Sequence, residues 1–146
     1  MSTDEVSTAE GLRAWARGMY PTEAAAELLI RAHGGSFAEK GRPWIEEYGR
    51  NRYRIDPEKL YPGYLSGGEQ RLLDIVGSLL SDEYHVALGH AISGLDRQTV
   101  ALVLAALSHA SGSQDHAAVG VIHAGDTEET PYGKAGALYP WPEEDV

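Results

Sequence analysis

The sequence predicts a single compact α+β domain, in which about four helices pack with a β-hairpin and one further strand. Three observations predict this fold class. The chain has 146 residues, of which 42% are hydrophobic and 23% charged, as in an ordinary globular domain. Apolar residues recur at helical spacing in four segments. Between residues 43 and 55, by contrast, two short apolar runs flank residues that favour turns.

The predicted organisation has three parts. Residues 1–6 are expected to be disordered, residues 7–124 to form the globular domain, and residues 125–146 to form an acidic C-terminal tail. We expect the tail either to wrap the domain through Tyr139 and Trp141 or to stay loose in solvent. The excess of arginine over lysine and the many alanines indicate a GC-rich bacterial genome.

Two helices are predicted within the first 33 residues. Ser7 and Glu10 have the spacing of a capping box, in which a hydroxyl and a carboxylate each accept a backbone amide proton at a helix start. A second helix is predicted over residues 21–33. Pro21 suits its first turn, and the glycine pair that follows residue 33 suits a helix end.

A β-hairpin is predicted over residues 43–55. Its strands are expected at residues 43–45 and 53–55, around a turn at residues 48–51. Because side chains alternate between the two faces of a strand, the arginines of the second strand should lie on one face and Tyr53 on the other.

Two later helices should complete the core together with residues 21–33. Ser66 and Glu69 again have capping-box spacing and begin a predicted helix over residues 66–80. The predicted helix over residues 96–110 is apolar around most of its circumference. We therefore expect it to be the most buried helix of the domain.

Two shorter apolar segments remain. Residues 84–92 fit a strand and a turn of helix equally well. Residues 117–123 have a β-like composition and are predicted to form the final strand.

Two glycine-containing strings lie near the starts of the later helices. The first is Leu65-Ser66-Gly67-Gly68-Glu69-Gln70, and the second is Ser93-Gly94-Leu95-Asp96. At this spacing they resemble the signature motif and the D-loop of the ABC-type ATPases and their SMC relatives. In that family the signature serine and glycines hold the γ-phosphate of an ATP bound by the opposing subunit. The resemblance thus implies a helix start that binds a nucleotide or another anion, formed here by Ser66, Gly67 and Gly68.

The chain departs from that family's pattern in two places. No G-x-x-x-x-G-K-[ST] loop, which would cradle the β- and γ-phosphates, occurs in the sequence. Gly89 and His90 stand where the family has its magnesium-binding Asp and its catalytic Glu. The alternative interpretation of the first string is a capping box with a glycine-rich lead-in.

Arginines and aromatic residues concentrate in the predicted hairpin. Such a surface can contact phosphates and stack on bases, so nucleic-acid binding is one hypothesis. Acidic residues share the same stretch, however, and the formal net charge of −10 repels a polyanion. The alternative is a set of Arg–Glu pairs on a solvated sheet face. The candidate partner-binding residues are Arg42, Trp44, Arg50, Arg52, Tyr53, Arg54 and, as an aromatic anchor in the tail, Trp141.

Several classes of site are not predicted. The chain has no cysteine, which excludes disulfides, thiolate zinc sites and cysteine nucleophiles. Its six histidines are widely spaced, the closest pair being His85 and His90, so no metal site is expected. No G-x-S-x-G nucleophile motif occurs. No catalytic residue and no cofactor is therefore predicted.

The expected function follows from these absences and from the charge. No apolar run reaches the ~20 residues of a membrane span, and the acidic N-terminus is unlike a secretory signal. We expect a cytoplasmic interaction or regulatory module that binds a protein partner, preferably a basic one. A homodimer through the apolar helix at residues 96–110 is an option, and nucleic-acid binding and nucleotide-dependent activity are the alternatives.

Overall fold

The computed structural model describes residues 6–116 and 136–143. In these residues five α-helices and one two-stranded antiparallel hairpin confirm the predicted α+β class. The α-helices and strands are α1 (Thr8–Ala16), α2 (Tyr20–Arg31), β1 (Ile45–Gly49), β2 (Arg52–Ile55), α3 (Gly67–Leu80), α4 (Leu88–Ser93) and α5 (Arg97–Ala110). The short 3-10 helices are η1 (Ala32–Ala38), η2 (Pro57–Lys59) and η3 (Ser113–Asp115).

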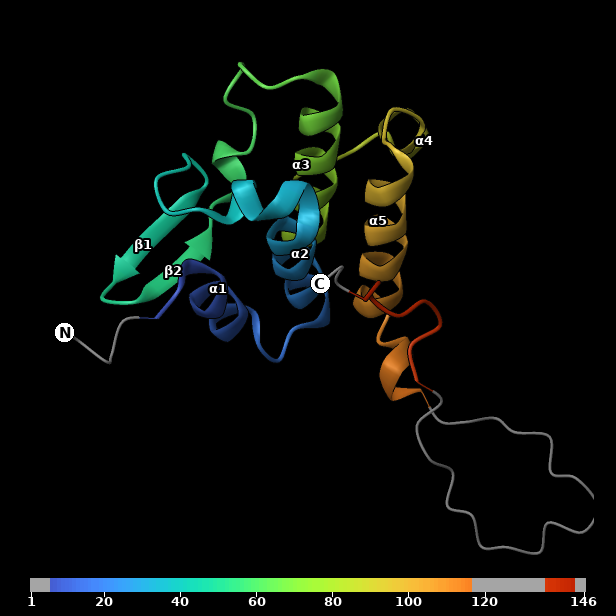
Figure 1. Ribbon diagram of the computed structural model, residues 1–146, viewed down its shortest axis with the longest axis horizontal. Coiled ribbons are helices and arrows are strands. Elements are labelled where there is room, and N and C mark those ends of the chain that lie inside the picture. The colour runs from blue at the N-terminus through green and yellow to red at the C-terminus, as the bar shows by residue number, and fades with distance from the viewer. Residues whose placement is uncertain (1–5, 117–135, 144–146) are drawn as a thin grey trace, which may run out of the picture.

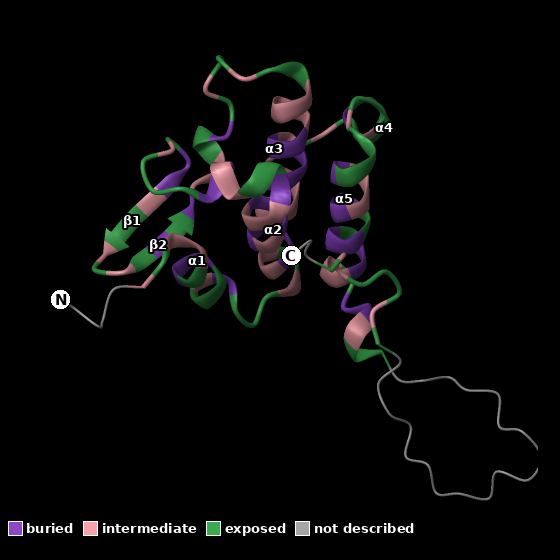
Figure 2. Cartoon of the chain, in the orientation of Figure 1, coloured by how far each residue is buried: buried purple, intermediate pink, exposed green. Residues whose placement is uncertain are grey.

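Helix α2 lies in the middle of the molecule. The hairpin and α1 lie on one side of it, α5 lies on the other, and α3 also packs against it (Figure 1). The buried residues gather along α2 and along the sides of α3 and α5 that face it (Figure 2). A single hydrophobic core therefore connects all the major elements.

The prediction that the helix at residues 96–110 is the most buried is wrong. In α2 only Pro21 is exposed, whereas α5 exposes Leu104 and Leu107 as well as its first two residues. The reason is position, because α5 lies at the edge of the helix layer and α2 covers only one side of it (Figure 1). The apolar part of the circumference of α5 is wider than the neighbouring elements can cover.

The predicted helix starts are present, and at α1 one of the two predicted capping-box bonds forms. The hydroxyl of Ser7 accepts a hydrogen bond from a backbone amide of the first turn of α1 at 3.1 Å. At α3 the full capping box forms, because Ser66 Oγ accepts from the Glu69 amide and Glu69 Oε1 accepts from the Ser66 amide, at 3.3 and 3.0 Å. The hydrogen bond from the Ser66 backbone N–H lowers the pKa of the Glu69 carboxyl. Asp96 caps α5.

The helix predicted over residues 21–33 ends at Arg31. His33, Gly34 and Gly35 have φ angles of 51°, 66° and 88°, which leave the helix in the left-handed region. Helix α2 therefore ends two residues earlier than predicted, at an extended C-cap residue, Ala32, and the glycine pair serves the turn that follows, because glycine adopts the left-handed region at little cost. The chain then turns into η1, whose Phe37 enters the core.

The hairpin begins later than predicted. Pro43 and Trp44 precede β1, and the strands pair from Ile45 opposite Ile55, with a register shift between Glu47 and Gly49. The predicted alternation is confirmed, since the two arginines of β2 are exposed while Tyr53 and Ile55 are buried.

Helix α1 approaches β2 closely at Gly11. A Cβ atom at this position would lie only 2.5 Å from Cδ2 of the buried Tyr53 ring. The hairpin is therefore joined to α1 by a contact that leaves no room for a larger residue.

The two shorter apolar segments have different outcomes. Within residues 84–92 the chain forms α4, a short helix, and no strand. The strand predicted over residues 117–123 lies outside the described residues.

Candidate functional site

Residues 136–143, here called the returning segment, lie against the C-terminal end of α5. Two buried hydroxyls hold them. Ser108 Oγ lies 2.9 Å from Ser113 Oγ and accepts a hydrogen bond from the Tyr139 amide at 2.9 Å, while Ser113 Oγ accepts one from the Leu138 amide at 3.2 Å. Of the two alternatives for the tail, these eight residues therefore follow the one in which the chain wraps the domain.

The returning segment and α5 together present an exposed apolar surface. Leu104 and Leu107 lie three residues apart on α5 with exposed fractions of 41% and 39%. Leu138 and Tyr139, whose amides bind Ser113 of η3 and Ser108 of α5, are 83% and 42% exposed. We call these four residues the apolar face.

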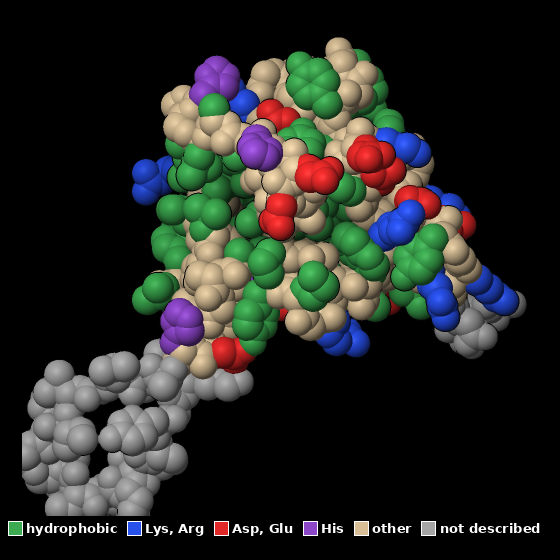
Figure 3. Space-filling view, turned by 180° about the vertical axis from the view of Figure 1, so that it is seen from behind, with side chains coloured by type: hydrophobic (Ala, Val, Ile, Leu, Met, Phe, Trp, Pro, Cys, Tyr) green, Lys and Arg blue, Asp and Glu red, His purple; other side chains and the backbone are tan. Residues whose placement is uncertain are grey.

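The apolar face lies at one edge of the molecule. Figure 3 shows hydrophobic side chains gathered along the edge that α5 forms, while most of the acidic side chains in this view lie over the middle of the molecule. Helix α5 itself contains no acidic residue.

A concave site lies between α1, α2, α5 and the returning segment. It has a volume of about 330 Å³. Because arginine is the most frequent residue type among its polar side chains, we call it the arginine pocket. Its lining residues are Arg13, Ala16, Arg17, Glu23, Ala26, Glu27, Arg31, His109 and Trp141.

Glu27 is the centre of the ion pairs in the arginine pocket. It accepts two hydrogen bonds from Arg13, at 2.8 and 2.9 Å, and one from Arg31 at 2.8 Å. Burial alone would raise the pKa of Glu27, but the bonds and charges of the two arginines outweigh burial and lower it. Glu27 therefore joins α1 to the C-terminal turn of α2 as a carboxylate.

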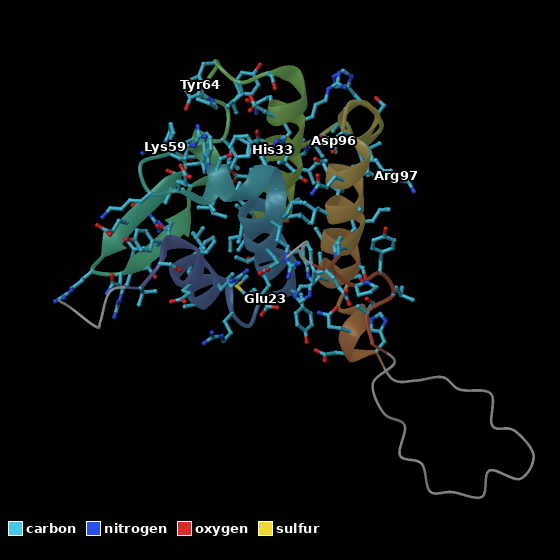
Figure 4. All side chains as sticks on the ribbon, in the orientation of Figure 1. Glu23, His33, Lys59, Tyr64, Asp96 and Arg97 are labelled. Atoms are coloured by element: carbon cyan, nitrogen blue, oxygen red, sulfur yellow. The ribbon has the colours of Figure 1, made fainter. Side chains whose placement is uncertain are left out.

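Glu23 forms a second cluster at the other end of α2 (Figure 4). It accepts the Gly18 amide at 2.8 Å and lies 2.7 Å from Nε2 of His109, whose ring packs edge-on against Tyr20. Burial raises the pKa of Glu23, while the Gly18 amide and His109 lower it, and the net shift is downward. This cluster connects α2 to α5.

Acid should weaken the fold partly through Glu27. A carboxyl whose pKa is lowered by folding stabilises the folded chain above its unfolded pKa of about 4.3, and that stabilisation is lost as the pH falls through the folded pKa. We expect Glu27→Gln to be less stable at pH 7 and to lose stability less steeply between about pH 5 and pH 3. Urea unfolding across this range measures both effects. Glu58→Gln, at an exposed position of η2, is the control, and a wild-type slope in Glu27→Gln would contradict the expectation.

Trp141 forms one wall of the arginine pocket. Its ring centroid lies 5.2 Å from Cζ of Arg31 and 6.4 Å from the His109 ring. Arg31 also donates a hydrogen bond to the carbonyl of Pro142 at 3.0 Å. The aromatic residue singled out in the tail thus packs, half-buried, on the domain itself.

The aromatic candidates of the hairpin are also buried. Trp44 is fully buried and donates its indole N–H to the Phe37 carbonyl at 2.7 Å, and Tyr53 is buried against α1. Arg42 lies over the Phe37 and Trp44 rings and donates to the Ser36 carbonyl at 3.0 Å. These side chains contribute to the core and its edge.

The exposed arginines of the hairpin differ in their pairing. Arg54 donates two hydrogen bonds to Glu46 across the strands, at 2.9 and 3.1 Å. The bond lowers the pKa of Glu46, and the guanidinium also lies over the Tyr48 ring. Arg50 and Arg52 are exposed at the turn and on β2. The hairpin surface is therefore a mixture of paired and exposed charges.

The two strings that resemble the ABC-type motifs meet in space. A Cβ atom at Gly68 would lie 3.6 Å from the Gly94 carbonyl oxygen, and the Arg71 guanidinium covers Gly94. Ser66 caps α3, and the space around Gly67 is open. The two strings therefore lie next to each other, one at the start of α3 and the other just before α5.

Sequence reasoning missed the arginine pocket. Arg13 and Trp141 lie at opposite ends of the chain, and Glu27 lies far from both in sequence, so no short motif could connect them. Glutamates such as Glu23 and Glu27 of α2 are also common on ordinary solvated helices.

Two classes of feature are absent from the part of the chain that the structure describes. No three histidine, aspartate or glutamate side chains there are grouped so that they could hold a metal ion. No helix among residues 6–116 and 136–143 has the length and apolar character needed to cross a membrane.

Comparison with known proteins reveals no relative: no protein-family model, no curated protein and no solved structure matches this chain.

Proposed function

We propose that this protein is a non-catalytic interaction module that binds a basic protein partner through the apolar face. The observation that supports the proposal is the joint exposure of four large apolar side chains on α5 and the returning segment. Contiguous apolar surface rimmed by polar residues is typical of protein-binding sites.

The geometry of α5 suits a protein partner. Leu104 and Leu107 form a ridge on a regular helix of 14 residues. Such ridges pack into the grooves of another helix or into an apolar cleft. Tyr139 adds an aromatic side chain with a polar end, a residue type enriched among the side chains that dominate binding energy.

The charge of the chain favours a basic partner over a second copy. The net charge is −10, so two copies repel each other at long range, whereas a basic protein is attracted and its association is accelerated.

Site-specific photo-crosslinking tests the proposal. A photoreactive amino acid at Leu104 should capture a basic protein in cell extract, and the same amino acid at the exposed Glu58 of η2 should not. Binding of the purified partner should weaken about tenfold or more in the double variant Leu104→Glu, Leu107→Glu, and it should weaken with salt. The variant Ala14→Glu, at an exposed position of α1, is the matched control.

Three outcomes would overturn the proposal. The first is a crosslink from residue 104 only to a second copy, with a dimer in sedimentation. The second is a partner that crosslinks from the hairpin and binds the double variant normally. The third is the absence of any specific crosslink from residue 104.

A further inference from the structure

The arginine pocket concentrates positive charge in a strongly acidic chain. Three arginines and two glutamates line it, so these five side chains carry a net charge of +1, against −10 for the whole chain. We propose that the arginine pocket binds a small organic anion, a carboxylate or a phosphate attached to an apolar body.

Internal ion pairs account for only part of this charge. Glu27 is shared by Arg13 and Arg31, so one carboxylate faces two guanidinium groups. Glu23 is occupied by the Gly18 amide and His109. The positive charge of the pocket thus exceeds what its own carboxylates neutralise.

Arg17 is the arginine of the pocket that takes no part in the hydrogen bonds to Glu23 and Glu27. It lines the pocket and is exposed. It has no hydrogen bond or ion pair to any residue that the structure describes, although it lies near enough to Glu23 to lower the pKa of that carboxyl. A guanidinium carries five donors in a planar fork that matches the oxygens of a carboxylate or a phosphate. Within the described part of the chain, Arg17 is therefore the pocket arginine that has no partner and that an incoming anion can bind.

The remaining walls suit an apolar body. Ala16, at the end of α1, and Ala26, in α2, are buried, and Trp141 adds a half-buried aromatic surface to the lining. A volume of about 330 Å³ is near the lower end for small-molecule sites. The ligand is thus a compact molecule with one anionic group.

The walls come from segments that the fold holds in place independently. Glu27 fixes α1 to α2, His109 fixes α5 to α2, and Arg31 fixes Pro142 and Trp141. A site whose walls are held before the ligand arrives loses little free energy to ordering on binding.

Titration of the isolated protein, followed by NMR of backbone amides and arginine Nε–H groups, tests the proposal. The probes are benzoate and phenyl phosphate, which distinguish a carboxylate from a phosphate site. The controls are neutral benzyl alcohol and sodium chloride at matched ionic strength. We expect saturable shifts at Arg17, Arg31 and Trp141 with at least one of the two anions, and none of comparable size with the controls.

A pair of variants separates the pocket from general charge. Arg17→Gln should weaken binding of the anion about tenfold or more. Arg52→Gln removes the same charge from an exposed position on β2 and should leave the affinity unchanged. Because Arg17 is exposed, its loss should leave the amide spectrum outside the pocket unaltered.

Several results would overturn the proposal. They are equal shifts with benzyl alcohol, equal shifts with chloride, equal weakening by the two arginine variants, or no saturable response to either anion. These measurements need no protein partner, so their outcome is independent of the function proposed for the apolar face.

Discussion

Replacing Trp44 by alanine is expected to lower the free energy of unfolding by about 3–5 kcal/mol. Trp44 is the largest fully buried side chain of the core. Its ring packs edge-on against Phe37, and its indole N–H donates to the Phe37 carbonyl at 2.7 Å. Truncation leaves a cavity and an unpaired carbonyl, which add their costs. Since a domain is stable by only about 5–15 kcal/mol, this single change should bring it close to unfolding at room temperature.

Urea unfolding measures this effect. The matched control is Tyr48→Ala, which removes an aromatic side chain from the same hairpin at an exposed position and should cost about 1 kcal/mol or less. Equal losses in the two variants would show that Trp44 does not hold η1 and the hairpin in the core.

Gly11→Ala is expected to destabilise the fold by up to about 2 kcal/mol. Alanine favours a helix over glycine by about 1 kcal/mol, but the new methyl group would lie 2.5 Å from the buried Tyr53 ring. The ring belongs to a packed core, and forcing such a side chain aside costs about 1–3 kcal/mol. The packing cost should therefore exceed the gain in helix propensity.

Gly67→Ala is the matched control for Gly11→Ala. It also lies in the first turns of an α-helix, but nothing lies within 4 Å of its added methyl group. We expect the stability of Gly67→Ala to be unchanged or raised by up to about 1 kcal/mol. Thermal unfolding measures the stability of both variants. A Gly11→Ala variant more stable than the wild type would contradict the expectation, because it would mean that α1 can move away from β2.

The features that the sequence predicted are those determined by near neighbours. The caps at Ser7 and Ser66 each need only a side chain and an amide three residues away. The glycines after His33 adopt the left-handed backbone of the turn that follows α2 through their own conformational freedom. The alternation that buries Tyr53 likewise follows from the geometry of one strand.

The features that sequence reasoning missed depend on packing between distant segments. The apolar residues of α5 fit a helix buried on all sides, and only the position of α5 at the edge leaves Leu104 and Leu107 exposed. Trp141 fits an anchor for a partner as well as it fits a wall of the arginine pocket, and the choice depends on Arg31 and His109. Neither relationship leaves a local pattern in the chain.

Residues 138 and 139 of the returning segment are attached to the domain more weakly than the core helices are attached to one another. Leu138 and Tyr139 are exposed, and what holds them is a pair of amide–hydroxyl hydrogen bonds to Ser108 and Ser113, with Trp141 adding partial burial. A net contribution of about 0.5–1.5 kcal/mol for each such bond is small beside the free energy of opening the core. We therefore expect the amides of Leu138 and Tyr139 to exchange with solvent faster than those of α2, while Arg31 keeps Pro142 and Trp141 against the domain.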